Sequence, residues 1–137
     1  GISDSSDATF LTVDSSEQAV IKSEGGAVTT SVQQGLSKAY ASVNGQSTAA
    51  TRGTFNMSSL TDNGTGNYTL DITSDMANTN YTGQLSGGDH DDTTDSFSRH
   101  YIYGLNTGNV SALIAATGSG SLYDATYFGF TIHGDLA

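Results

Sequence analysis

The chain has 137 residues and a formal net charge of −10, with 14 acidic residues against four lysines and arginines. So few cations exclude a nucleic-acid partner, because neutralising phosphates needs many Lys and Arg side chains. The absence of cysteine excludes disulfides and thiolate metal sites. Uninterrupted apolar runs are only a few residues long, so we expect no membrane insertion, which takes roughly 20 apolar residues for a helix.

The apolar content is low for a single folded chain. Leu, Ile, Val and Phe together number 26 of 137 residues, a share at which a chain can fail to bury enough surface to fold. Partial disorder is one interpretation, and an oligomer whose copies complete a small core is the other. Seven tyrosines and repeated apolar and polar alternation favour the oligomer. Abundant Thr, Tyr, Gly and Asn are typical of an all-β protein with tight turns.

The first residues predict a short hairpin. Residues 1–8 are polar and irregular, whereas the patterns of residues 9–14 and 18–23 predict two short strands joined by a turn. Hairpins of this length are marginal alone in water, so we expect three-fold assembly to supply neighbours. Residues 24–26, Glu-Gly-Gly, form a flexible joint. We therefore predict an N-terminal shaft or assembly segment at residues 1–26 and a β-sandwich domain at residues 27–137.

Residues 27–45 fit two patterns. Five of them share the spacing of one helical face, namely Val32, Leu36, Ala39, Tyr40 and Val43. Gly35 interrupts that helix, and from Ser37 onward apolar and polar residues also alternate. We predict a strand over residues 37–43, closed by the turn signal Asn44-Gly45.

Residues 52–82 carry the clearest pattern of the chain. Two alternating runs are present, with Phe55 and Met57 in the first and Tyr68, Leu70 and Ile72 in the second. Asn63-Gly64 lies between them, and this dipeptide favours a type I′ turn, in which both central residues take positive φ. The stretch predicts a β-hairpin.

Further strands are predicted in the second half of the chain, at residues 78–87, 97–104, 109–116 and 126–134. A short helix is the alternative for residues 109–116. In the strand at 97–104, Phe97, Tyr101 and Tyr103 share a face with Arg99, and Phe128, Phe130 and Ile132 share a face of the last strand. Short strands separated by turns predict an antiparallel β-sandwich that is jelly-roll-like.

The most acidic stretch, residues 87–95, is predicted to be an exposed loop. It holds four carboxylates and His90, and the carboxylate oxygens are candidate calcium ligands by composition, namely those of Asp89, Asp91, Asp92 and Asp95. The glycine and the terminal acidic residue of an EF-hand loop are missing. We therefore interpret the stretch as a solvated surface loop and predict no metal.

No catalytic motif is present. Glycoside hydrolysis would need two positioned carboxylates, and although Asp71, Asp75 and Asp124 can be nominated, nothing in their local sequence singles them out. A nucleophile elbow, an HExxH motif and a phosphate loop are all missing. We expect no enzymatic activity and no cofactor. The histidines His100 and His133 are expected to be structural or exposed, rather than metal ligands on a three-fold axis.

An ordered set of short motifs resembles a known family. They are Lys38-Ala39-Tyr40, Asn44-Gly45, Arg52, residues 55–59, residues 61–66 and Tyr68-Thr69. This order is similar to the C-terminal domain of tail-fibre and other virion structural proteins of tailed bacteriophages, many from marine or cyanobacterial hosts. The similarity covers residues 9–82 well and the final ten residues loosely, and it weakens through residues 84–124. Tyr40 replaces the family's usual Trp.

The resemblance implies a protein localised in the virion and assembled as a homotrimer that contacts other virion proteins. Its N-terminal part would join three chains, and its β-sandwich would face outward for host attachment. The implied partner is a host cell-surface receptor, such as a glycan. We expect receptor binding by the loops and strand after Gly83, with the candidate residues Asp89, His90, Asp91, Asp92, Asp95, Tyr101, Tyr103 and Asn106.

Two other functions are compatible with the same sequence. A capsid-decoration protein, as head cement or head fibre, would use the same acidic trimer to stabilise the shell. A tailspike-like polysaccharide depolymerase would need a carboxylate pair, and the sequence favours it least.

Overall fold

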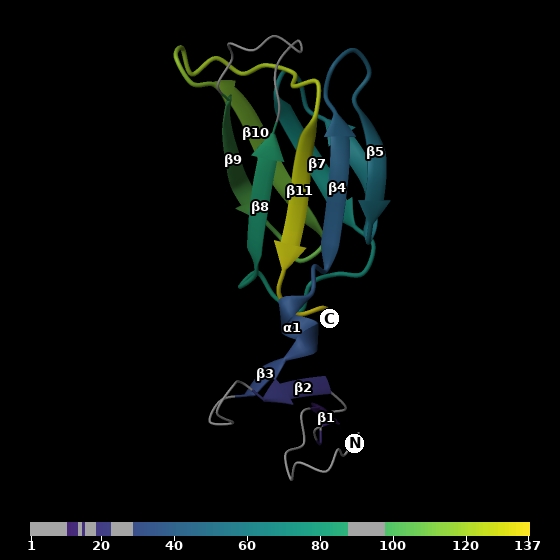
Figure 1. The fold of residues 1–137 in the computed structure, drawn as a ribbon. Coiled ribbons are helices and arrows are strands. Elements are labelled where there is room, and N and C mark those ends of the chain that lie inside the picture. The colour runs from purple at the N-terminus through teal and green to yellow at the C-terminus, as the bar shows by residue number, and fades with distance from the viewer. Residues whose placement is uncertain (1–10, 14, 16–18, 23–28, 88–97) are drawn as a thin grey trace. The chain divides into compact units, whose positions relative to one another are not determined.

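The computed structural model describes residues 11–13, 15, 19–22, 29–87 and 98–137 (Figure 1). The chain divides into two compact units, Gly1–Leu36 and Ser37–Ala137. The predicted joint at residues 24–26 lies outside the described residues.

The first unit contains three very short strands and one helical turn. Strands β1 (Leu11–Val13), β2 (Ala19–Lys22) and β3 (Thr29–Ser31) form an antiparallel sheet with β2 in the centre. The helix α1 (Val32–Gly35) has only four residues. The helical spacing that begins at Val32 therefore produces a single turn, and the chain leaves it at Gly35.

The second unit is an antiparallel β-sandwich, which confirms the predicted fold class. One sheet has the order β6-β7-β10-β9 and the other β5-β4-β11-β8, and in Figure 1 the second sheet lies in front of the first. The strands are β4 (Ala39–Asn44), β5 (Ala50–Phe55), β6 (Met57–Asp62), β7 (Asn67–Ile72), β8 (Thr82–Gly87), β9 (Ser98–Leu105), β10 (Asn109–Ala116) and β11 (Phe128–His133).

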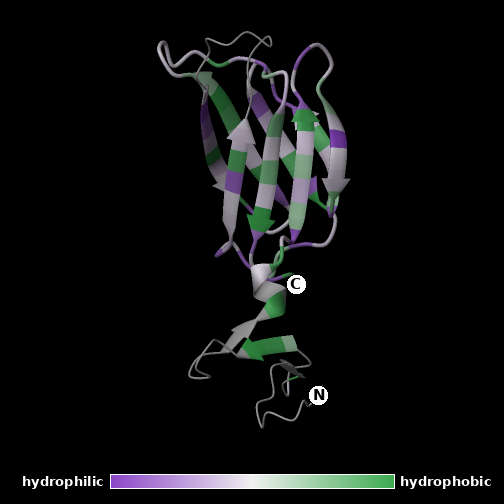
Figure 2. Ribbon diagram, viewed as in Figure 1, coloured by the Kyte–Doolittle hydropathy of each residue, from purple (hydrophilic) through white to green (hydrophobic). Residues whose placement is uncertain are grey.

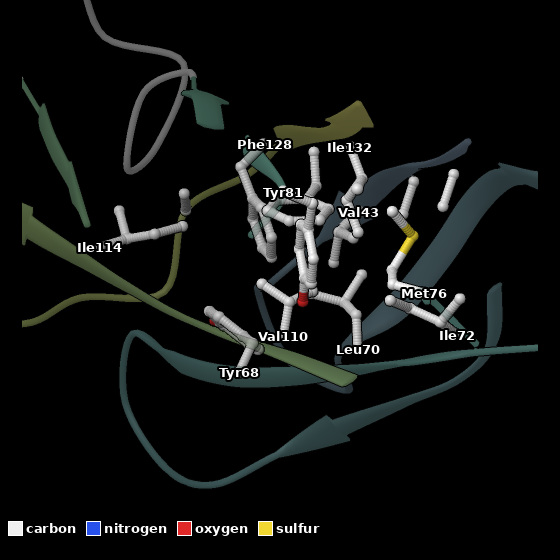
Figure 3. Close-up of a cluster of buried hydrophobic side chains, with 14 of the residues drawn as sticks. Val43, Tyr68, Leu70, Ile72, Met76, Tyr81, Val110, Ile114, Phe128 and Ile132 are labelled. Atoms are coloured by element: carbon white, nitrogen blue, oxygen red, sulfur yellow. The ribbon is translucent and has the colours of Figure 1, made fainter. Parts of the chain in front are cut away.

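Hydropathy alternates along several strands (Figure 2), and the buried residues of each sheet form one apolar row inside the sandwich. In β4, Ala39, Ala41 and Val43 are buried while Tyr40 is exposed, so the strand interpretation of this segment is confirmed. β10 is likewise a strand and not a helix. The predicted buried face of β11 is confirmed as well. The largest fully buried side chains meet between the sheets (Figure 3), and they are Tyr68, Phe128, Phe130, Leu70, Met76, Ile114, Ile132, Val43 and Val110.

Asn56 makes a corner between the two sheets, which corrects one prediction. Its φ of 54° lies in the left-handed region that Asn tolerates better than most residues. The Asn56 side chain fixes the corner by donating to the Lys38 carbonyl at 3.0 Å and accepting from the Ser74 amide at 2.8 Å. Phe55 therefore ends β5 on an exposed surface, whereas Met57 begins β6 and packs against the core. The two residues do not share one strand face as predicted.

The predicted hairpin is confirmed as β6 and β7, but its turn type was wrong. Positive φ occurs at Gly64 and Gly66, not at Asn63. The Asn63 amide donates to the Asn67 carbonyl at 2.8 Å, and the Asn67 amide donates to Gly64 at 2.9 Å. A four-residue loop thus replaces the two-residue type I′ turn. A Cβ at Gly66 would meet the Ile114 and Tyr123 backbones, so tertiary contacts favour this loop.

Strand β8 begins at Thr82, four residues later than predicted. The preceding Tyr81 is buried, and its hydroxyl donates to the Asn106 carbonyl at 2.7 Å. This bond secures the turn between β9 and β10 against the segment that enters β8.

A buried tyrosine connects the loops at one end of the sandwich. The Tyr68 hydroxyl donates to Asp124 Oδ1 at 2.8 Å, and the same oxygen accepts from the Gly66 amide at 2.7 Å. Burial of the ring, followed by the hydrogen bond to Asp124, raises the pKa of Tyr68 above its ordinary value. The ring itself packs on Phe128, with centroids 4.9 Å apart.

Replacing Asp124 by Ala should destabilise the fold, because two buried donors lose their acceptor. We expect a loss of about 2 to 3 kcal/mol in the free energy of unfolding, measured by urea denaturation. Asp124→Asn is the matched control, since an amide oxygen still accepts both bonds, and it should cost about 1 kcal/mol. Equal stability of the Ala variant and the parent chain would contradict this role for Asp124.

Candidate functional site

The outer face of the sheet β6-β7-β10-β9 carries a row of hydrogen-bonded polar side chains. The Asn63 side chain donates to Thr69 Oγ1 at 2.9 Å, and Thr69 Oγ1 lies 3.2 Å from Ser111 Oγ on the neighbouring strand. Farther along β7, Ser59 of β6 donates to Asp71. The polar side chains in this part of the face hydrogen-bond to one another, so few of them are available to bind a ligand.

The edge strand β9 adds exposed aromatic side chains to that face. Tyr101 and Tyr103 are 46% and 54% exposed, and they share the outer face with Arg99, as predicted. The predicted fourth member, Phe97, lies outside the described residues. The strand register places Tyr101 opposite Leu113 of β10, which is in turn opposite Asn67 of β7. We call the surface of Asn67, Tyr101, Tyr103 and Leu113 the Tyr103 face.

Tyr103 lies across the sheet. Its hydroxyl donates to Asn67 Oδ1 at 2.8 Å, although the order β7-β10-β9 places a whole strand between the two residues. Neighbouring strands are roughly 4.8 Å apart, so the side chain must run over β10 to reach β7. A tyrosine that lies along a sheet and is half exposed presents one flat ring face to solvent.

A hollow of about 290 Å³ opens on the other sheet. It is lined by Ser42, Ser86, Gly87, Tyr127, Phe128 and Gly129, and we call it the Gly129 hollow. Gly129 pairs with Ser42 of β4 on one side and with Ser86 of β8 on the other. The Arg52 guanidinium donates to the Thr126 carbonyl at 2.9 Å and so fixes the backbone directly before Tyr127.

A stacked aromatic pair occupies the same outer surface as the Gly129 hollow. Tyr40 and Phe55 are both exposed, and their ring centroids are 6.1 Å apart with an interplanar angle of 25°. They lie on neighbouring strands at paired positions. Tyr40 is therefore an exposed surface aromatic, not part of the core.

The structure brings together two of the predicted receptor-facing residues, Tyr101 and Tyr103. Asn106 lies in the turn after β9, where its side chain donates to Asn109 Oδ1 at 2.9 Å and so serves the turn. Asp89, His90, Asp91, Asp92 and Asp95 lie outside the described residues.

Sequence reasoning missed every member of the Tyr103 face and of the Gly129 hollow except Tyr101 and Tyr103. Asn67 and Tyr127 belong to them only through long-range contacts, which no local pattern signals. Gly129 could have been found from the sequence. A glycine between two phenylalanines of a predicted strand, here residues 126–134, indicates a place where another group approaches the backbone.

The nominated carboxylates do not face a common space. Asp124 binds the inward-facing Tyr68, whereas Asp71 lies on the opposite, outward side of β7 with Ser59. Within the described ranges, no group of three His, Asp or Glu side chains is arranged to hold a metal ion. The described part of the chain also has no helix that is long and apolar enough to cross a membrane.

His100 is a titratable group turned toward the inside at the β8 and β9 edge. Its Nε2 atom is buried without a hydrogen-bond partner among the described residues, and the imidazole lies against Gly87, where no Cβ would fit. A protonated ring would be a partly buried cation, and burial accordingly lowers the pKa of His100.

Comparison with protein-family models, curated proteins and solved structures gives no match for this chain. The resemblance to phage tail-fibre domains therefore remains a prediction from the motifs.

Stability should fall below about pH 6.5, where an unfolded histidine begins to take up a proton. The pKa of His100 is lower in the folded chain than in the unfolded chain. The stability that the neutral ring contributes is therefore fully present above the unfolded-state pKa, and it is lost as the pH falls through the folded-state pKa. Urea denaturation between pH 7.5 and 5.5 should therefore show a smaller loss for His100→Gln than for the parent chain. His133→Gln serves as the control, and equal losses in all three proteins would contradict the assignment.

Proposed function

We propose that this chain is a bacteriophage virion structural protein, a tail-fibre-like module that attaches to a host-surface glycan through the Tyr103 face. The observation that carries the proposal is the half-exposed Tyr103 ring, held across β10 by its bond to Asn67. A ring fixed in this way loses little conformational entropy when a ligand stacks on it. The motif resemblance to virion proteins supports the location.

A sugar fits the chemistry of the Tyr103 face better than a protein loop or a charged polymer does. The axial C–H groups of a pyranose pack on an aromatic face, and its hydroxyls bond to side chains beside that face. Tyr101 extends the aromatic surface, and Asn67, whose Oδ1 accepts from Tyr103, borders it with its side-chain amide. A rigid sheet also positions these groups more precisely than a loop would. The proposed role is binding without catalysis.

Tyr103→Ala should weaken glycan binding about tenfold or more, because the stacking ring is lost. Tyr103→Phe keeps the ring but loses the bond to Asn67 that holds it flat, so its affinity should fall by about threefold, clearly less than that of Tyr103→Ala. Binding is measured on an array of purified bacterial surface polysaccharides, followed by titration of whichever polysaccharide binds the parent chain. Failure of the parent chain to bind any polysaccharide, or parent-like binding by Tyr103→Ala, would overturn the proposal.

We also propose that the chain forms a homotrimer through its first unit. The sandwich has a hydrophobic core within one chain, so the small apolar content does not require a shared core there. In contrast, β1, β2 and β3 have only three or four residues each. Strands that short need further partners for stability.

Light scattering of the full chain should give three times the 14.1 kDa of one chain. A single-chain mass at micromolar concentration would contradict the homotrimer and would leave the glycan proposal to stand on its own test.

A further inference from the structure

A glycine lies on an inner strand of the sheet β5-β4-β11-β8 where packing does not require one. Gly129 is the second residue of β11, between the buried Phe128 and Phe130, and faces the outside. Glycine in a strand interior costs roughly 0.5 to 1 kcal/mol relative to Ala. A Cβ at this position would meet only Ser86, with Oγ at 2.8 Å, and that hydroxyl can rotate away. The missing side chain therefore serves to keep the Gly129 hollow open.

The lining of the hollow selects a neutral, hydroxyl-rich ligand. Ser42 and Ser86 flank its floor, and each hydroxyl both donates and accepts hydrogen bonds. Tyr127 supplies an exposed aromatic ring. None of the described residues that line the hollow is charged, and the net charge of −10 on the chain repels anions. A cationic ligand would likewise find no carboxylate among these residues.

The hollow is open to solvent rather than enclosed. Its volume of about 290 Å³ lies at the small end of the range for sites of drug-sized ligands, roughly 300 to 1,000 Å³, and leaves room for one ring. Gly129 allows a flat ring to approach the backbone of β11, whereas the Cβ position of Gly87 points inward and is filled by the His100 imidazole.

We propose that the Gly129 hollow binds one neutral pyranose unit, stacked on Tyr127 and hydrogen-bonded to Ser42 and Ser86. This site lies on the other sheet from the Tyr103 face, so it does not depend on the function proposed above. It would give each chain a second sugar contact, with its own specificity.

Saturation-transfer NMR on the full chain tests the site with single sugars. The probes are glucose, galactose, mannose, rhamnose and N-acetylglucosamine, with glucuronate as the charged counterpart. We expect transfer to at least one neutral sugar and none to glucuronate. The Gly129→Val and Tyr127→Ala variants are measured in the Tyr103→Ala background, so that the Tyr103 face adds no transfer. There, Gly129→Val should abolish the transfer, because its methyl groups fill the hollow and valine suits a strand.

Two control variants make the test specific. Gly53→Val places the same side chain on the same outer face, at a position where a Cβ meets nothing within 4 Å, and should keep the transfer. Tyr103→Ala should keep it too, which separates this site from the Tyr103 face. Thermal unfolding should show that Gly129→Val is at least as stable as the parent chain. If Gly129→Val does not fold, Tyr127→Ala takes its place in the test, and that variant should also lose the transfer.

The proposal is overturned if no neutral sugar shows transfer, if glucuronate gives equal transfer, or if the folded Gly129→Val or Tyr127→Ala variant keeps the signal. A disaccharide ending in the sugar that binds distinguishes the source of the ligand. Stronger transfer to the disaccharide assigns the hollow to a glycan chain, and transfer to the monosaccharide alone assigns it to a free sugar.

Discussion

The hydroxyl of Tyr68 must find a partner inside an apolar core, and the partners it finds join three loops of the sandwich. It donates to Asp124 at 2.8 Å and lies 3.3 Å from the Gly45 carbonyl, while Asp124 also accepts from Gly66. Gly45 follows β4, Gly66 precedes β7, and Asp124 lies between β10 and β11. An unsatisfied hydroxyl here would cost on the order of 1 to 3 kcal/mol, so one carboxylate fixes the path of the loop that delivers Tyr127 to β11.

The surfaces assigned to binding depend on that frame. Tyr103 lies flat because Asn67, the residue next to Tyr68, is held at a fixed position on β7. Tyr127 borders the Gly129 hollow because the segment before it is held by Asp124 and by the Arg52 bond to Thr126. Both surfaces are built on strands rather than on loops, so their geometry is set before any ligand arrives, which reduces the entropic cost of binding.

Local alternation predicted most of the fold, because burial in a two-layer sandwich repeats every second residue. The strand at β11 and the outward face of β9 could be assigned from sequence alone. The corner at Asn56 could not, since its left-handed backbone is secured by contacts with Lys38 and Ser74, both 18 residues away. The same limit applies to the candidate site. Tyr101 and Tyr103 were identified as exposed strand residues, but the bond from Tyr103 to a residue 36 positions earlier depends on the strand order, which no local pattern contains.

Mapping amide chemical shifts while a binding polysaccharide is titrated into the labelled protein tests most directly whether a sheet face carries attachment. If the Tyr103 face binds the glycan, the largest shifts should fall on the adjacent strands β7, β10 and β9, at Asn67, Tyr101, Tyr103 and Leu113. Shifts confined to residues 88–97, with β7, β9 and β10 unchanged, would contradict it and return attachment to the acidic stretch.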